Sequence, residues 1–336
     1  MAPASTSSTG PDSGPKAFCV NRYTGVNNLL RFRVHLEALK YLHLRAFLGS
    51  IGHPHDGRPC DIVGSVKPRS IVFDLFGDYV RYRGGAARLR TLSTLMGCFG
   101  VGESTVRVVL ARLRKEGWFD VRREGRETLY ALNKRSLQLL DEGRSRIFDR
   151  APSDWDRHWY MVIYSVPESE RAVRDHIRKE LAWLGFGPLA PSTYVCPHDR
   201  LQQVRERFAD EPAVRLDTLR CQSGGLPVDR EMAARSWDLA ALNEDYRELL
   251  RTYRVRMPSY RAGALSPEEA LVERMRLTYD YRKFPFRDPD LPTELLPAGW
   301  VGHEAHDMFL EAHEILGPSA ESYYDEVAGS RPGARP

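Results

Sequence analysis

The sequence predicts an α+β multidomain protein with a winged helix-turn-helix, a ferredoxin-like α/β middle domain and a helical C-terminal domain. Three observations carry this prediction. Helical hydrophobic spacing followed by two strand-like runs occupies residues 68–133, strands alternate with helices over 151–225, and helical spacing alone continues over 226–328. At 336 residues the chain is too long for one small core, so several domains are expected.

Bulk composition narrows the class of protein without identifying it. The chain is 42% hydrophobic and 28% charged, as in ordinary globular proteins. We find neither an apolar run of the ~20 residues that cross a bilayer nor the apolar core of a secretory signal, so we expect a cytoplasmic protein without a membrane span. The five cysteines include no Cys-x-x-Cys pair, which argues against a disulfide framework or a structural zinc site. A net charge of +4 is only mildly basic, so the position of the charges has to decide about nucleic acid.

The two ends of the chain carry little structural signal. Residues 1–17 are rich in Pro, Ser, Thr, Ala and Gly, which is typical of disorder. Helical spacing over Asn28–Leu48 is followed by a turn-rich stretch, and we expect a poorly defined extension over 1–67 and a disordered tail over 329–336. Possible metal ligands in the extension follow no known ligand spacing, so no metal site is expected; these residues are His53, His55, Asp56 and Cys60.

Three amphipathic helices followed by a β-hairpin are expected in 68–133. Apolar residues recur there every three or four positions, and then two strand-like runs flank Glu124-Gly125-Arg126, a hairpin signature. Gly117 ends the third helix. The predicted elements are helices at Arg69–Arg81, Leu89–Met96 and Glu103–Glu116 and strands at Trp118–Arg123 and Glu127–Leu132. This order is that of a winged helix-turn-helix.

The third helix has an apolar face and, opposite it, a face of basic and small side chains. Small side chains let a helix backbone approach the bases of a major groove about 12 Å wide, and arginines beside them can bond guanine edges or phosphates. The hairpin adds arginines suited to phosphates or a minor groove. The candidate DNA-binding residues are Ser104, Arg107, Val108, Ala111, Arg112 and Lys115 in the helix and Arg122, Arg123 and Arg126 at the hairpin. Either basic feature alone is typical of a solvated surface, but both in this order favour DNA binding.

The glycine-rich stretch before this helix has the spacing of a phosphate-binding loop. Glu103, however, occupies the position where such a loop needs a lysine. A carboxylate there would repel phosphate. We therefore interpret these glycines as the turn between two helices, and we expect no nucleotide site.

Beyond Leu132 the pattern indicates a connecting helix, an α/β unit and then helices. Asn133 is a suitable N-cap for the connecting helix Lys134–Phe148, within the linker 134–150. The middle domain is expected to contain strands at His158–Val166, Ser192–Cys196 and Val214–Cys221 and helices at Glu168–Leu184 and His198–Ala209. The expected C-terminal helices are Leu239–Val255, Pro267–Phe284 and Glu304–Val327.

Several motifs together resemble the PaaX family, repressors of phenylacetic acid degradation, over residues 68–326. The resemblance rests on Glu103-Ser-Thr-Val-Arg107, Gly117-Trp118, Tyr164-Ser-Val-Pro-Glu168, Leu184-Gly-Phe-Gly187, Asp288-Pro-Asp-Leu-Pro292 and Gly299-Trp-Val-Gly302. The resemblance implies a homodimeric repressor that binds a palindromic operator in double-stranded DNA. It also implies release by an aryl-acyl-coenzyme A effector such as phenylacetyl-coenzyme A.

The same resemblance raises an alternative, a metal-dependent nuclease. The family's middle domain is similar to a ferredoxin-like nuclease of CRISPR adaptation, which carries a metal-binding aspartate at the end of its first strand. In this sequence that strand ends in Ser165-Val-Pro, so the metal lacks an anchoring carboxylate. We therefore expect a non-enzyme without cofactor or metal. A helical assembly scaffold with an incidental basic patch is a third alternative.

The C-terminal section supplies candidate effector-binding residues. Aromatic faces suit an aryl ring and guanidinium groups suit coenzyme A phosphates, although core packing and local pairing are the ordinary alternative. The candidates are Tyr281, Arg282, Arg287 and Trp300. Nearby, His303-Glu-Ala-His306 is one residue short of the zinc-protease spacing, and His306 and His313 are two turns apart, so packing or surface histidines are expected.

Overall fold

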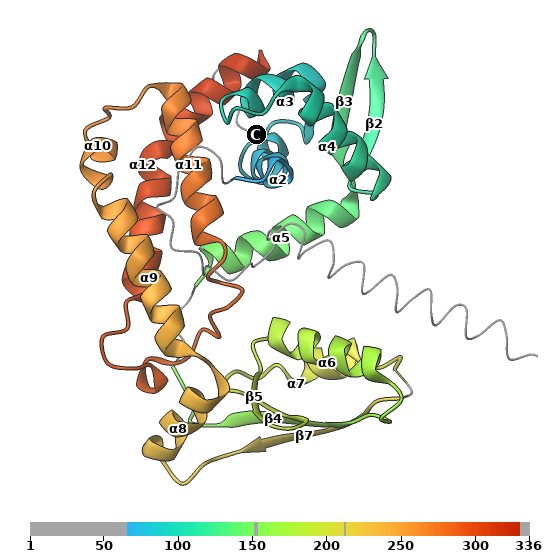
Figure 1. Cartoon of the computed structure of the whole chain (residues 1–336), viewed down its shortest axis with the longest axis vertical. Helices are drawn as coiled ribbons and strands as arrows, with labels where there is room; N and C mark the ends of the chain where they lie inside the picture. The colour runs from blue at the N-terminus through green and yellow to red at the C-terminus, as the bar shows by residue number, and fades with distance from the viewer. Residues whose placement is uncertain (1–65, 151–153, 212, 330–336) are drawn as a thin grey trace, which may run out of the picture. The chain divides into compact units, whose positions relative to one another are not determined.

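The computed structural model describes residues 66–150, 154–211 and 213–329, shown as coloured ribbon in Figure 1. The expectations for residues 1–65, among them the helix over Asn28–Leu48 and the four possible metal ligands between His53 and Cys60, lie outside the described residues. The expectation for the tail beyond Gly329 lies outside them as well. The described chain combines helices with two small antiparallel sheets, so the α+β prediction is confirmed.

The predicted helices and hairpin of the first region are present. They are α2 (Pro68–Asp78), a 3-10 turn (Val80–Tyr82), α3 (Leu89–Gly97), α4 (Glu103–Lys115), β2 (Phe119–Glu124) and β3 (Glu127–Leu132). Pro68 begins α2 at a position where its missing N–H costs no helical hydrogen bond. The sequence does not predict β1 (Ala86–Arg88), because three residues of weak strand propensity carry no signal. Strand β1 pairs with β3, which gives the sheet order β1-β3-β2.

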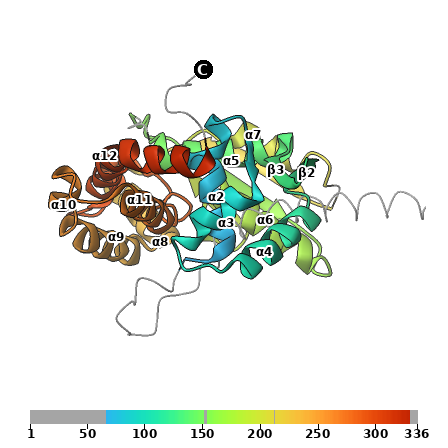
Figure 2. The ribbon, with the colours of Figure 1, turned by 90° about the horizontal axis from the view of Figure 1, so that it is seen from above.

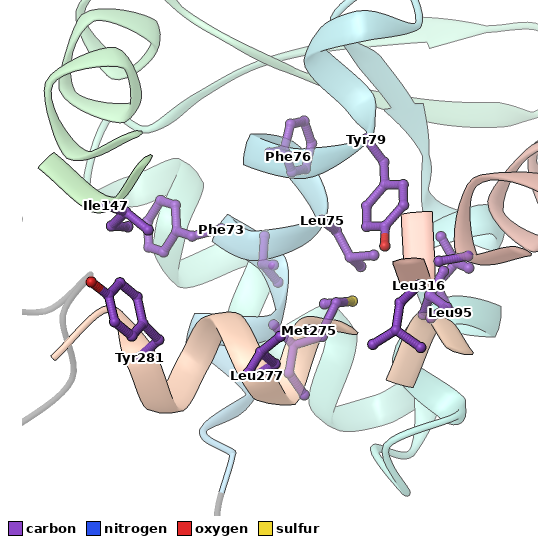
Figure 3. Packing of buried hydrophobic residues seen from close by; sticks show 14 of the residues in the cluster. Phe73, Leu75, Phe76, Tyr79, Leu95, Ile147, Met275, Leu277, Tyr281 and Leu316 are labelled. Carbon is purple, nitrogen blue, oxygen red and sulfur yellow. The ribbon is translucent and has the colours of Figure 1, made fainter. Parts of the chain in front are cut away.

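Helix α2 is enclosed by other elements. Every residue from Ser70 to Phe76 is buried, and α2 contacts both α3 and α4, as Figure 2 shows. Its apolar side chains belong to a cluster that also contains residues of the C-terminal helices. In Figure 3, Leu75 of α2 points toward Met275 of the C-terminal section. The first region therefore shares its hydrophobic core with the end of the chain.

The connecting helix α5 (Lys134–Phe148) has the bounds that the sequence predicts. The side chain of Asn133 accepts a hydrogen bond from the N–H of Ser136 at 3.0 Å, as an N-cap does. The amide of Asn133 also donates to the carbonyl of Gly117 at 2.7 Å. This second bond joins the start of α5 to Gly117, two residues after the end of α4.

The middle region is a four-stranded antiparallel sheet with two helices. Its elements are β4 (Trp159–Ser165), α6 (Arg171–Trp183), β5 (Gly187–Ala190), β6 (Thr193–Cys196), α7 (Leu201–Arg207) and β7 (Arg215–Cys221), and the strand order is β5-β6-β4-β7. Alternate residues of β4 face opposite sides, as expected from the strand period of two. Val162 packs against residues of α6 and α7. Trp159, on the other side, packs in a separate cluster with residues of α8 (Leu226–Ser236).

Two elements of this part are absent from the sequence prediction. Strand β5 begins at Gly187 in a stretch that reads as a turn, and α8 (Leu226–Ser236) lies where the sequence gives no separate helix. A Cβ at Gly187 would lie 2.5 Å from the ring of Trp237, so glycine is required for this approach. The close contact with a residue 50 positions later is invisible in the local sequence.

The C-terminal section is helical, as predicted. It comprises α9 (Leu239–Arg254), α10 (Met257–Arg261), α11 (Pro267–Tyr281), a 3-10 turn (Thr293–Leu295) and α12 (Gly302–Ala328). Helix α11 begins with a capping box, in which Ser266 and Glu269 bond each other's backbone N–H. Within residues 226–328 the sequence prediction does not include α8, α10 or the 3-10 turn. Among the described helices, none is long and apolar enough to cross a membrane.

Candidate nucleic-acid interface

Helix α4 is held by its apolar face. Val106, Leu110 and Leu113 are fully buried, and α4 contacts α2 and α3. The turn before it contains Gly100 at φ +73°, a conformation that glycine adopts without strain. The spacing of Val106, Leu110 and Leu113 along the helix therefore fixes which face of α4 points away from the core.

The opposite face of α4 is open to solvent. Val108 is 67% exposed. All six candidates of this helix are exposed: Ser104, Arg107, Val108, Ala111, Arg112 and Lys115. Helical geometry thus brings them together on one surface, with small and apolar side chains between basic ones.

The arginines of α4 are paired with glutamates of the same helix. Arg107 lies 2.5 Å from Glu103, and Arg112 lies 3.1 Å from Glu116, each one turn away. The Glu116 carboxylate is shared with Arg69 of α2, at 2.5 Å. Exposed pairs of this kind contribute only about 0–1 kcal/mol. Arg107 and Arg112 can therefore exchange a carboxylate for a phosphate or a base edge at low cost.

The β2–β3 hairpin adds a second exposed basic surface. Glu124 and Glu127 are opposite each other, so Gly125, at φ +60°, and Arg126 form a two-residue turn. Strand β2 contacts α4, and Figure 1 shows the hairpin extending beside that helix. The three hairpin candidates, Arg122, Arg123 and Arg126, are all exposed. Among the described residues, Arg123 and Arg126 have no carboxylate within ion-pair distance.

The structure separates the four effector candidates. Tyr281 is buried, its ring stacks on Phe309 at 4.0 Å, and its hydroxyl is 2.8 Å from Nδ1 of His306. Arg282 is also fully buried, in an ion pair with Asp74 of α2.

The other two candidates are nearer the surface. Arg287 is exposed and lies 2.6 Å from Asp245, while Trp300 is half-buried and packs edge-on against Tyr246 at 5.6 Å. Of the four candidates, Arg287 alone lines a cavity of about 510 Å³ between α5, α6 and the loop after α11. The other three are packing or pairing residues in this conformation.

The histidines of α12 are dispersed. His303 is exposed, while burial lowers the pKa of His306, which contacts Tyr281. Burial also lowers the pKa of His313, whose Nε2 is 3.8 Å from Asp78 and whose ring meets Phe148 at 4.9 Å. In the part of the chain that the structure describes, no group of three or more His, Cys, Asp or Glu residues is placed to hold a metal ion.

These features define a class: an α+β protein that exposes a basic helix face and an arginine-tipped hairpin. The chain belongs to the PaaX family. Three family models match consecutive parts of it, "PaaX-like protein" over residues 67–136, "PaaX protein central Cas2-like domain" over 152–233 and "PaaX-like protein C-terminal domain" over 237–326.

Two individual proteins are similar to this chain. The chain is 32% identical over 279 residues to the transcriptional repressor PaaX of Escherichia coli strain K12, covering 81% of this chain and 87% of the relative. Among solved structures, the uncharacterized protein Rv0674 from Mycobacterium tuberculosis is similar, with a TM-score of 0.54, 23% identity and coverage of 78% of this chain and 98% of that one. At this identity the second similarity establishes the fold alone.

Proposed function

We propose that this protein is a DNA-binding transcriptional repressor of a phenylacetate-type catabolic operon, released from DNA by an aryl-acyl-coenzyme A. The observation that carries the proposal is the exposed face of α4 beside the basic hairpin, in a member of the PaaX family. The name of the Escherichia coli relative, a transcriptional repressor, supports the same function. A cytoplasmic location is part of the proposal.

In this proposal α2 to β3 form a winged helix-turn-helix, with α4 as recognition helix and the hairpin as wing. The small side chain of Ala111 and the apolar Val108 let α4 enter the major groove, where Val108 can contact a thymine methyl group. Arg107 and Arg112 then flank the contact, and the hairpin arginines lie against phosphates.

A homodimer follows from the need for specificity. One helix of 13 residues reads only a few base pairs, and two copies related by a two-fold axis read half-sites about 34 Å apart in a palindrome. The β-α-β-β-α-β order of the middle region is that of a ferredoxin-like unit, which we propose as part of the dimer scaffold.

A metal-dependent nuclease is not favoured. Strand β4 ends at Ser165, where the nuclease requires a metal-binding carboxylate, and the relative is named a repressor. A cleavage assay on plasmid DNA with Mg²⁺ or Mn²⁺ separates the two functions.

The proposed function is tested by footprinting the full chain on DNA upstream of its own gene, with and without phenylacetyl-coenzyme A. We expect one protected segment with two-fold symmetry, steep salt dependence, and loss of protection when the thioester is added. Equal protection of random DNA, or strand cleavage with either metal ion, would contradict the proposal.

A further inference from the structure

A cavity of about 510 Å³ lies where three segments meet: the end of α5, the connection between α6 and β5, and the loop 285–290. Its volume is within the range of small-molecule sites, which is about 300–1,000 Å³. The end of α5 supplies polar and charged residues, the stretch from α6 to β5 supplies apolar ones, and the loop supplies both, while Arg200 and Trp237 complete the lining. It is distinct from the surface of α4 and from the hairpin.

One wall of the cavity is aromatic. The rings of Trp183 and Phe286 stack with centroids 5.3 Å apart and an interplanar angle of 21°. The guanidinium of Arg146 lies 3.7 Å from the centroid of Trp183 and 5.6 Å from that of Phe286. Both rings are half-buried. They offer π faces and edges to a third planar group, in the offset geometry that aromatic pairs prefer.

The charge of the lining is unevenly compensated. Arg150 is 2.6 Å from Asp288 and 3.2 Å from Asp290, and Arg287 pairs with Asp245. Arg200 instead donates to the carbonyl of Leu184 at 3.0 Å, and among the described residues no carboxylate lies within ion-pair distance of it. A carbonyl oxygen has no formal charge, so the positive charge of Arg200 is available to an anion at the cavity.

The loop wall is held by hydrogen bonds. Asp290 has φ +56°, a left-handed conformation that aspartate adopts more readily than most residues with a side chain. Its N–H donates to Oδ1 of Asp288 at 2.8 Å, and its carbonyl is 2.7 Å from Nε2 of His198 on the middle region. These two contacts hold the loop that lines the cavity.

We propose that this cavity is the effector site and that it binds an anionic aromatic ligand. The proposal rests on the repressor function above and names the site of its regulation. The aryl group packs against Trp183 and Phe286, and the anionic part of the ligand pairs with Arg200 and, at the rim, with Arg287.

A ligand here acts on DNA binding through α5. This helix contributes Arg146 to the cavity, and Arg150 lies two residues after it. Its N-cap, Asn133, bonds Gly117, which lies two residues after α4. An aryl group against Trp183 and Phe286 meets Arg146, which lies over both rings, and so changes the contacts at one end of a helix about 22 Å long. The other end of α5 follows β3. Ligand binding therefore shifts the protein away from the conformations in which the hairpin and α4 fit the operator.

Two variants test the site by isothermal titration of the full chain with phenylacetyl-coenzyme A. Arg200→Gln removes the free charge, and Ala182→Trp fills the cavity from an exposed position on α6. The controls are Arg178→Gln and Ala172→Trp, both on α6, which are exposed and lie outside the cavity. We expect at least tenfold weaker binding for Arg200→Gln, near loss for Ala182→Trp, and less than a twofold change for both controls.

Operator binding without ligand is measured in parallel, and we expect all four variants to keep the wild-type affinity. If the wild type does not bind phenylacetyl-coenzyme A, or if Arg200→Gln and Ala182→Trp bind it as the wild type does, the site assignment is wrong. Equal affinity for coenzyme A alone would remove the aromatic part of the proposal. Ligand binding at this site by a protein that protects no DNA would instead refute the repressor function.

Discussion

The guanidinium of Arg282 at the end of α11 forms an ion pair with the carboxylate of Asp74 in α2, and the two side chains are 1% and 4% exposed. The ring of Tyr279 lies 4.8 Å from the same guanidinium. Burial raises the pKa of Asp74 to about 7, against the opposing effect of Arg282. This pair connects α2, in the proposed DNA-binding region, to the C-terminal helices.

Removing one partner of this pair should be far more destabilising than replacing both. Asp74→Ala leaves the Arg282 charge buried without its carboxylate, which costs about 3–5 kcal/mol, whereas Asp74→Leu combined with Arg282→Met leaves no buried charge and costs much less. The free energy of unfolding from urea titrations measures both. Arg251→Met, which removes only exposed ion pairs, serves as the control with a change within about 0.5 kcal/mol. A double variant as unstable as Asp74→Ala would mean that loss of the ion pair itself, and not the unpaired charge of Arg282, causes the destabilisation.

The sequence predicts the surface of α4 well and the role of Arg282 poorly, for a physical reason. The exposure of Val108 follows from the helical period of its own neighbours, and the hairpin turn follows from Gly125. The partner of Arg282 is 208 positions away, so only the folded chain reveals that this arginine is enclosed.

The two strands that the sequence does not predict, β1 and β5, depend on their pairing partners. Strand β1 exists because β3 offers an edge to pair with, and β5 exists because β6 does. Neither stretch carries a local strand pattern. The cavity likewise depends on Arg146, Trp183 and Phe286 meeting from three separate segments, so local patterns name its residue types without placing them together.

Arg107→Ala should reduce the preference for the operator over random DNA. In the proposed complex this side chain leaves Glu103 for a base edge, and a good base contact contributes about 1–3 kcal/mol of discrimination. We expect roughly a tenfold loss of the affinity ratio in fluorescence anisotropy with the two duplexes. Arg251→Ala, an exposed arginine of α9, should leave the ratio unchanged. An equal loss on both duplexes would assign Arg107 to phosphate contacts.

Arg123→Ala and Arg126→Ala should weaken binding to both duplexes by similar factors. Phosphates carry no sequence information, so loss of such a contact lowers affinity without changing specificity. Each variant should also reduce the slope of log affinity against log salt concentration by about 1. Titrations at several salt concentrations measure this slope. An unchanged slope in both variants would show that the hairpin arginines do not neutralise phosphates.

The protein should lose stability as the pH falls below 6.5, in part because of His306. Burial and the nearby charge of Arg150 lower the pKa of this histidine below 6.5, so the unfolded chain takes up the proton before the folded chain does. Stability is then fully present above pH 6.5 and decreases below it, by at most about 1.4 kcal/mol per pH unit for this group. His306→Gln keeps a hydrogen-bonding group near the Tyr281 hydroxyl but does not titrate.

We therefore expect the stability of the wild type to fall more steeply than that of His306→Gln between pH 6.5 and 5, in urea titrations. Asp74, whose raised pKa acts in the opposite direction, and His313 titrate in both proteins, so their contributions cancel in the difference. Parallel curves for the two proteins over this range would mean that His306 is protonated in the folded chain as readily as in the unfolded one.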